Sequence, residues 1–238
     1  MSKYQDIYNQ IRGDIERGEY KAGSTLPGEF FLMEQYNVSR DTVRKALGLL
    51  AANGYIQKSR GVGSIVLDIN RIEFPVSGLV SFKELAPVLG DHVETRVIAF
   101  EKMHPDERIK KELELNDEDW VWLIQRVRKV DGEAVILDTD FLNAQIAPGL
   151  TEEQAKDSLF AYLEGDLGLK IAYAEKEITC QAATNMDRRW LDLKDNNMVV
   201  SVVSHTYLED TRVFQYTSSR HRPDKFRFKD FARRIQKA

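Results

Sequence analysis

Three segments of helical periodicity followed by a short basic hairpin occupy the first 67 residues, and few folds accept this order. Apolar residues recur at steps of three and four between residues 3 and 17, which predicts an amphipathic helix there. A shorter helix is predicted over residues 29–36 and a third over residues 39–53. Residues 55–67 form two short strand patterns around a basic tip that contains glycine. This order predicts a winged helix-turn-helix.

The third helix and the hairpin tip carry the side chains that DNA recognition requires. Ser39 can accept a hydrogen bond from the free amides of the helix start, and Arg40 and Arg44 lie one turn apart on the face opposite the apolar residues. Long donors in the first turns of such a helix reach base edges in the major groove. A basic tip with glycine suits close approach to sugar and phosphate. The predicted DNA-binding residues are Ser39, Arg40, Thr42, Arg44, Lys58, Arg60 and Gly61.

The distribution of charge supports a local contact with a polyanion. The formal net charge is −4, yet residues 38–67 hold five lysines and arginines against one aspartate, and residues 219–238 hold eight against two. A basic patch on an acidic chain indicates local binding of nucleic acid rather than a protein coated onto it. The basic tail is interleaved with Phe226, Phe228 and Phe231, and we interpret it as a packed terminal strand with solvated charges.

Composition excludes disorder and membrane insertion as the main states. Apolar residues make up 42% of the chain, and no apolar run approaches the roughly 18 residues that cross a bilayer. The first residues lack the apolar segment of a secretion signal, and a single cysteine, Cys180, cannot form an internal disulfide. We expect a soluble cytoplasmic protein without membrane partner, metal site or cofactor, in which Cys180 is buried in a strand.

The pattern changes near residue 70, which predicts a DNA-binding domain of residues 1–70 and a second domain of residues 71–238. Strand patterns there alternate with short helices, and several strands are joined by loops of hairpin length. This favours a mainly antiparallel sheet with helices packed on it and places the chain in the α+β class. Strands are predicted near residues 94–102, 120–130, 133–142, 170–182, 197–208 and 212–221, and helices near 105–114, 151–164 and 184–191.

Two arginines in the second domain indicate an anionic ligand. Arg126 and Arg128 are two apart on a predicted strand, so both point to one face, where two guanidinium groups can hold a phosphate. Asp138 and Asp140 share a face of the next strand and can accept hydrogen bonds from sugar hydroxyls. The arrangement suits a phosphorylated sugar.

The turn between the two strands decides whether the arginines and aspartates meet. A two-residue turn at Asp131-Gly132 would put Val130 opposite Glu133 and place the pairs on opposite faces. A three-residue loop with a left-handed Gly132 in a bulge would put Lys129 opposite Glu133 and place all four on one face. We predict the bulge.

Four segments of the first half, residues 26–29, 36–47, 53–56 and 60–64, carry a recognisable pattern. They resemble the DNA-binding half of GntR-type bacterial transcription regulators. Gly28 departs from that pattern, because the family usually has a small capping residue such as serine there, and Gly48 departs by lying inside the third helix. Such a glycine should cost about 1 kcal/mol against alanine unless something packs closely on it.

The second half resembles the ligand-sensing domain of the HutC branch of that family, through residues 74–85, the strand with Arg126 and Arg128, and residues 214–228. The resemblance implies a UTRA domain of chorismate-lyase-like fold and a repressor released by a sugar phosphate. It implies phosphate contacts from Ser81, Arg126, Arg128 and Ser158, with Phe160 where relatives often have tyrosine, and sugar contacts from Asp138, Gln215 and His221.

A single winged helix buries little surface, so we expect a homodimer that reads a palindromic operator in double-stranded DNA, one half-site per copy. The hypothesis is a repressor released by a phosphorylated disaccharide, with an amino-sugar phosphate as the alternative effector. Other interpretations stay open: Arg40 and Arg44 as solvated charges, Arg126 and Arg128 paired with surface carboxylates, and His221 as a structural histidine. An enzyme acting on a sugar phosphate is a remote alternative, and no catalytic residue is predicted.

Overall fold

The computed structural model describes residues 2–59, 61–67, 79, 81–89 and 92–228, which belong to two compact units. The units divide after Ile72. The predicted boundary at residue 70 lies outside the described residues and stays a prediction. None of the described helices combines the length and the apolar character that a membrane crossing requires.

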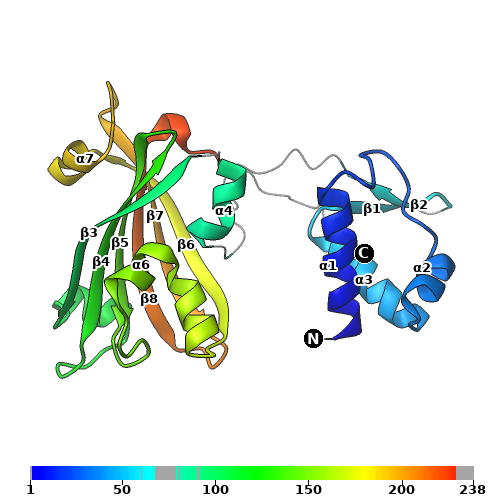
Figure 1. Ribbon diagram of the computed structural model, residues 1–238, viewed down its shortest axis with the longest axis horizontal. Helices are drawn as coiled ribbons and strands as arrows, with labels where there is room; N and C mark the ends of the chain where they lie inside the picture. The colour runs from blue at the N-terminus through cyan, green and yellow to red at the C-terminus, as the bar shows by residue number, and fades with distance from the viewer. Residues whose placement is uncertain (1, 60, 68–78, 80, 90–91, 229–238) are drawn as a thin grey trace, which may run out of the picture. The chain divides into compact units, whose positions relative to one another are not determined.

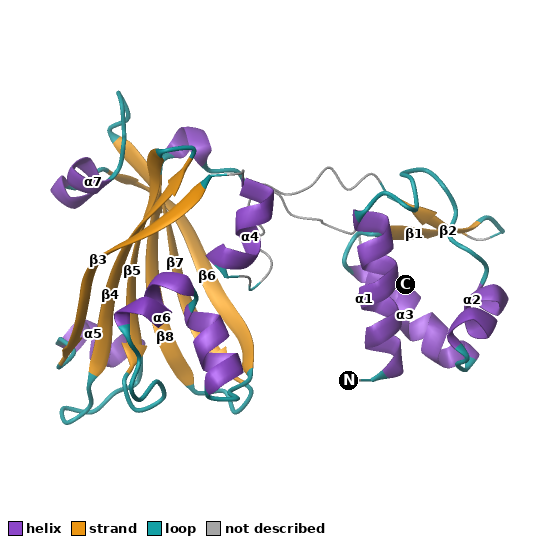
Figure 2. Cartoon of the chain, viewed as in Figure 1, coloured by secondary structure: helices purple, strands orange, loops and turns teal. Residues whose placement is uncertain are grey.

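The first unit contains the three predicted helices and the predicted hairpin. They are α1 (Lys3–Glu16), α2 (Glu29–Tyr36), α3 (Arg40–Ala52), β1 (Ile56–Ser59) and β2 (Gly63–Val66). Helices α1 and α3 pack against each other beside the hairpin (Figure 2). Ile11, Leu32 and Leu50 are almost completely buried between the helices. This confirms the predicted winged helix-turn-helix, in which an antiparallel β-hairpin follows the three helices.

The second unit is a six-stranded antiparallel sheet with helices packed on it, as the sequence predicts (Figure 1). The strand order is β3-β4-β5-β8-β7-β6. The strands are β3 (Val93–Met103), β4 (Val121–Val130), β5 (Glu133–Asn143), β6 (Ile171–Ala182), β7 (Met198–Leu208) and β8 (Val213–His221). The helices are α4 (Phe82–Leu89), α5 (Glu107–Glu112), α6 (Glu152–Asp157), the π-helix η1 (Ala161–Asp166), α7 (Asn185–Trp190) and the 3₁₀ turn η2 (Pro223–Lys225). The α+β class is confirmed.

Helices cover both faces of this sheet. Ala155 of α6 and Leu163 of η1 are buried with Ile124 and Leu142 on one face. On the other face Leu191, after α7, packs with Val127 and Leu137, and Ile109 of α5 packs with Val121 and Tyr216. The face under α6 and η1 is the one that carries the polar residues considered below.

Two helical segments differ from the sequence prediction. The predicted helix over residues 151–164 is divided, because Ser158 adopts an extended backbone (φ −161°) and ends α6 before η1 begins. Helix α4 was not predicted. Ser81 starts it: the Ser81 amide donates to the Glu84 carboxylate at 2.6 Å, and the Glu84 amide donates to the Ser81 hydroxyl at 3.2 Å.

The β4–β5 turn differs from the predicted three-residue loop, but the arginines and aspartates share one face as predicted. Val130 pairs with Glu133, and Asp131 and Gly132 form a two-residue turn with φ of 52° and 80°. A two-residue turn with both φ values positive suits the strand twist. The register then shifts, since Lys129 pairs with Ala134 while Arg128 pairs with Ile136. The extra residue places the arginines and aspartates on one face, but it lies in β5 rather than in the turn.

Cys180 is exposed, and the prediction that it is buried is wrong. It lies in β6, which pairs only with β7 among the described strands and forms an edge of the sheet. An edge strand has a neighbour on one side only, so an apolar strand pattern does not by itself imply burial there.

Gly48 lies inside α3, and a Cβ added there meets no atom within 4 Å. We therefore expect Gly48→Ala to stabilise α3 by about 0.5–1 kcal/mol, because alanine loses less backbone entropy on folding. Hydrogen–deuterium exchange of α3 peptides in the DNA-free protein measures this. Exchange as fast as in the wild type would show that the helix gains nothing from the Cβ.

Candidate functional site

The strand register places polar residues side by side on the face under α6 and η1. Arg126 on β4 pairs with Asp138 on β5, which pairs with Ser219 on β8. Two residues further along β5, Asp140 pairs with Thr217 on β8, and Thr217 pairs in turn with Ser204 on β7. Because side chains alternate along each strand, all of these point to the same face.

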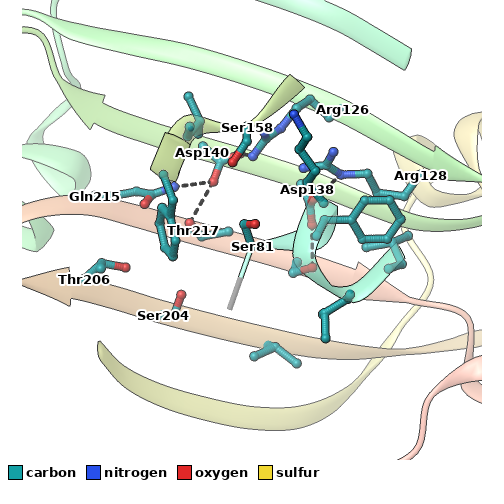
Figure 3. Close-up of a pocket in the computed structure, with 18 of the residues that line it drawn as sticks. Ser81, Arg126, Arg128, Asp138, Asp140, Ser158, Ser204, Thr206, Gln215 and Thr217 are labelled. Atoms are coloured by element: carbon teal, nitrogen blue, oxygen red, sulfur yellow. Dashed lines mark hydrogen bonds and ion pairs between the residues drawn. The ribbon is translucent and has the colours of Figure 1, made fainter. Parts of the chain in front are cut away.

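These rows form the floor of a cavity of about 200 Å³. Residues of α4 and of the α6–η1 segment line its other sides. Figure 3 shows bonds from Gln215 and Thr217 converging on Asp140, with Ser204 and Thr206 on the neighbouring strand. Every predicted effector-binding residue lines this cavity: Ser81, Arg126, Arg128, Asp138, Ser158, Gln215 and His221.

The two arginines are buried and paired with the two aspartates. Arg126 Nη2 lies 2.6 Å from Asp140 Oδ2, and Arg126 Nη1 donates to the Ala155 carbonyl oxygen at 2.9 Å. Arg128 Nε lies 3.0 Å from Asp138 Oδ2, and its Nη1 donates to the Thr95 hydroxyl at 2.6 Å. The alternative that these arginines pair with surface carboxylates is therefore wrong, because both pairs are inside.

Burial and charge compete at these pairs. Burial opposes ionisation of Asp138, but Arg128, Arg126 and the bond from Ser219 outweigh it, so the pKa of Asp138 lies below its ordinary value. Burial, followed by the neighbouring Arg126, lowers the pKa of Arg128 to about 10. Both groups remain charged near pH 7. The cavity wall therefore holds two buried ion pairs.

Two polar atoms of the site are buried and have no hydrogen-bond partner among the described residues: Arg126 Nε and Gln215 Oε1. A buried polar group without a partner costs about 1–3 kcal/mol. A ligand that offers an acceptor to Arg126 Nε and a hydroxyl to Gln215 Oε1 would recover that free energy once the two side chains turn toward it. A phosphate oxygen and a sugar hydroxyl supply these two groups.

Ser81 and Ser158 start the helical segments that border the cavity. The Ser81 hydroxyl accepts from the Glu84 amide, and the Ser158 hydroxyl accepts from the Ala161 amide at 3.2 Å. Each hydroxyl still has its own hydrogen to donate to a ligand oxygen. Phe160 also lines the cavity and brings no hydroxyl, as the sequence indicates.

His221 lies at the end of β8, buried in the cavity wall. Its Nε2 is 3.0 Å from the Ser219 hydroxyl. Burial lowers the pKa of His221 to about 4, although Asp138 acts in the opposite direction. The imidazole is therefore neutral at pH 7 and can exchange hydrogen bonds with an uncharged group.

Several residues that line the cavity were not predicted from the sequence. Thr217 and Ser219 have the same parity on β8 as Gln215 and His221, so strand alternation alone could have found them. Ser204 and Thr206 share a face of β7 in the same way. Lys176, on β6, and Phe82, on α4, had no such signal, because their positions depend on which strands and helices become neighbours.

In the first unit, Arg40 and Arg44 are held by one carboxylate. Arg40 Nε lies 2.8 Å from Glu29 Oε2 and Arg44 Nε lies 3.2 Å from Glu29 Oε1, while both arginine side chains stay 65% and 57% exposed. The hydrogen bond from Arg40 is the main cause that lowers the pKa of Glu29. The two guanidinium groups are thus oriented together at the start of α3.

The other predicted DNA contacts are placed as follows. The Ser39 hydroxyl accepts from the Thr42 amide and lies 2.9 Å from the Thr42 hydroxyl. Lys58 is exposed on β1, and Gly61 has a φ of 81°, a left-handed conformation that favours glycine. Arg60 lies outside the described residues. Of the described residues, no group of three or more histidines, cysteines and acids is arranged to hold a metal ion.

Comparison with known proteins assigns both halves. Residues 3–66 match the model of bacterial regulatory proteins of the gntR family, and residues 89–227 match the UTRA domain. The chain is 52% identical over 234 residues to the HTH-type transcriptional regulator TreR of Bacillus subtilis, with 98% of each chain covered. It is 31% identical to the mannosyl-D-glycerate transport/metabolism system repressor MngR of Escherichia coli, covering 97% of this chain and 96% of MngR.

Two solved structures resemble it closely. The possible transcriptional regulator YydK of B. subtilis superposes with a TM-score of 0.81 at 25% identity, covering 98% of this chain and 100% of YydK. The effector-binding domain of the B. subtilis trehalose repressor superposes with a TM-score of 0.56 at 48% identity, covering 60% of this chain and 99% of that domain.

The depressed pKa of His221 predicts a loss of stability in mild acid. In the unfolded chain His221 binds a proton below about pH 6.5, whereas in the folded chain its pKa of about 4 keeps it neutral until the pH is much lower. The folded state should thus lose about 2 kcal/mol between pH 7 and pH 5 through this group. His221→Gln should remove that loss.

Urea unfolding followed by tryptophan fluorescence measures it in the second unit, because Trp120, Trp122 and Trp190 all lie there. The carboxylates titrate in both proteins, so the difference between wild type and variant isolates the histidine. Equal pH dependence of the two would contradict the burial of a neutral imidazole.

Proposed function

The chain belongs to the GntR family of bacterial regulatory proteins and carries a UTRA domain, and from that membership we propose that it represses genes of trehalose uptake and utilisation and leaves its operator when trehalose 6-phosphate binds. Family membership makes it a DNA-binding transcription repressor with a small-molecule effector domain. The observation that supports a phosphorylated effector is the buried arginine pair whose Arg126 Nε has no partner. The 52% identity to TreR, together with the 48% identity to the effector-binding domain of the B. subtilis trehalose repressor, supports trehalose as the sugar.

A phosphate fits the arginine end of the cavity. Each guanidinium has five N–H donors, and Arg126 uses two of them in the bonds to Asp140 and the Ala155 carbonyl. The remaining donors, together with the hydroxyls of Ser81 and Ser158, can surround the oxygens of a phosphate. A phosphate dianion carries about two negative charges, so it attracts the two guanidinium groups in addition to the two aspartates that already neutralise them.

The rest of the cavity suits a neutral sugar better than an amino sugar. Asp138 and Asp140 are already bonded to Arg128 and Arg126, so neither carboxylate is left to pair with a ligand ammonium. The other floor residues offer hydroxyls and an amide, chiefly Thr217, Ser219 and Gln215. These groups exchange hydrogen bonds with sugar hydroxyls without requiring charge. This favours trehalose 6-phosphate over an amino-sugar phosphate as the effector.

An enzyme of the same fold would need acid and base groups free to act on the ligand. Asp138 and Asp140 lie two residues apart on β5, both on one side of any ligand, and each is in an ion pair. Glycosidic cleavage requires carboxylates that flank the bond. The geometry thus favours binding over turnover, and incubation of pure protein with trehalose 6-phosphate without release of glucose is the expected result.

Operator binding is proposed to use two copies of the chain, each placing α3 in the major groove of one half-site. The two DNA-binding units of the dimer can then be arranged in a way that fits the operator or in a way that does not. The effector acts by binding more tightly to the arrangement that does not fit. By linkage, operator DNA must weaken effector binding by the same factor.

Arg126→Ala is expected to lose the response to the effector. Trehalose 6-phosphate should release wild-type protein from operator DNA, whereas the variant should need at least about tenfold more, because two charge-assisted bonds are lost. Fluorescence anisotropy of a labelled operator during effector titration measures both affinities. Glucosamine 6-phosphate, tested alongside, should release the wild type only at higher concentration.

The substitution leaves Asp140 buried without its partner, which is destabilising. The double variant Arg126→Met with Asp140→Asn removes both charges and should behave as Arg126→Ala does. Arg96→Ala removes an exposed arginine on the other face of β3 and serves as the matched control. Loss of operator binding along with the response would make Arg126 structural.

Arg44→Ala is expected to weaken operator binding by about ten- to a hundredfold, the effect of losing one bidentate base contact. Its affinity for trehalose 6-phosphate should not change, because Arg44 lies in the other unit. Arg17→Ala, which removes another exposed arginine of the first unit, is the control. A normal gel shift for Arg44→Ala would reject α3 as the recognition helix.

A further inference from the structure

Lys176 lines the effector cavity at the end opposite the arginines. It lies on the edge strand β6, half-buried, and pairs across the sheet with Ser204 on β7. Ser204 pairs with Thr217, and Thr217 with Asp140. Lys176 therefore continues the polar row that begins at Asp140, beside Arg126, and Figure 3 shows Ser204 on the strand next to that of Thr217.

The acids that line the cavity lie on β5 and α6. The three lining carboxylates, Asp138, Asp140 and Asp157, form ion pairs with Arg128, Arg126 and Lys83 respectively. Lys176 is the cationic lining residue on β6. The lining residues on β6 and β7 include no acid, because the neighbouring Glu175 and Glu177 have the opposite parity on β6.

The separation of the two ends matches a ligand longer than one sugar. Strands β4 and β6 are four strand spacings apart in the sheet order, which is roughly 19 Å along the sheet. A pyranose ring spans about one such spacing, ~5 Å. A phosphate held between Arg126 and Ser158 would leave room for one ring over β5 and β8 and a second ring over β8 and β7, next to the strand that carries Lys176.

We propose that Lys176 binds the second, unphosphorylated ring and makes the pocket select a phosphorylated disaccharide over a phosphorylated monosaccharide. This rests on the proposed function and names a residue that determines its specificity. The ammonium donates hydrogen bonds to hydroxyl or ring oxygens of that sugar. Burial removes water from around the Lys176 ammonium and thereby lowers its pKa, so each hydrogen bond to a ligand oxygen offsets part of that lost hydration.

Lys176→Met tests the proposal, because it keeps the length of the side chain and removes its donors. Dissociation constants for trehalose 6-phosphate and glucose 6-phosphate are measured by calorimetry on the full-length protein. The variant should bind trehalose 6-phosphate about tenfold more weakly or worse, the loss of one charge-assisted interaction. Its affinity for glucose 6-phosphate should stay within about twofold of the wild type.

Lys170→Met is the matched control, since that lysine is 75% exposed and pairs with Glu209 outside the cavity. The melting temperature of each variant reports whether it folds, and Lys176→Gln provides a second neutral side chain. Equal weakening for both ligands would mean that Lys176 contacts the phosphate and would overturn the proposal, as would unchanged affinity for both. Failure of the wild type to bind trehalose 6-phosphate would instead reject the proposed function.

Discussion

Two buried ion pairs, Arg126 with Asp140 and Arg128 with Asp138, are the constraint on which the second unit depends. An isolated charge inside a protein is costly, so two arginines can stay on the inner face only with carboxylates on the adjacent strand. The register shift between Arg128 and Lys129 brings those carboxylates to that face. Buried pairs of this kind add little net stability compared with apolar residues, so stability alone does not account for them.

The first unit could be predicted from the sequence because its signals are local. The cap at Ser39 and the apolar spacing around Leu47 and Leu50 each depend on a few neighbouring residues. The positions of the strands along the chain and the shared face of Arg126 and Asp138 were also predictable in outline. The position of the bulge was not, because the amide of Arg222, 87 residues away along the chain, donates to the Val135 carbonyl there at 2.9 Å.

Other parts of the site depend on contacts between distant segments. Lys176 faces the cavity only because β6 pairs with β7, and Cys180 on the same strand is exposed because β6 lies at the edge. Phe82 lines the cavity because α4 places its ring 4.6 Å from the Arg128 guanidinium. No pattern in residues 79–89 alone specifies that contact. Helix α4 is joined to the cavity floor by this contact and to α6 by the bond from Lys83 to Asp157.

Both units hold a pair of arginines on carboxylates. In the first unit the single carboxylate of Glu29 serves Arg40 and Arg44, and in the second each arginine has its own aspartate. The carboxylates reduce repulsion between neighbouring guanidinium groups and fix their direction before any anion arrives. The same carboxylates compete with an arriving anion for the guanidinium groups, so an anion of low charge or poor fit gains little binding free energy. Under the proposed function, a doubly charged phosphate ester in the second unit and a row of DNA phosphates beside base edges in the first must exceed that competition, so that discrimination is obtained in exchange for some affinity.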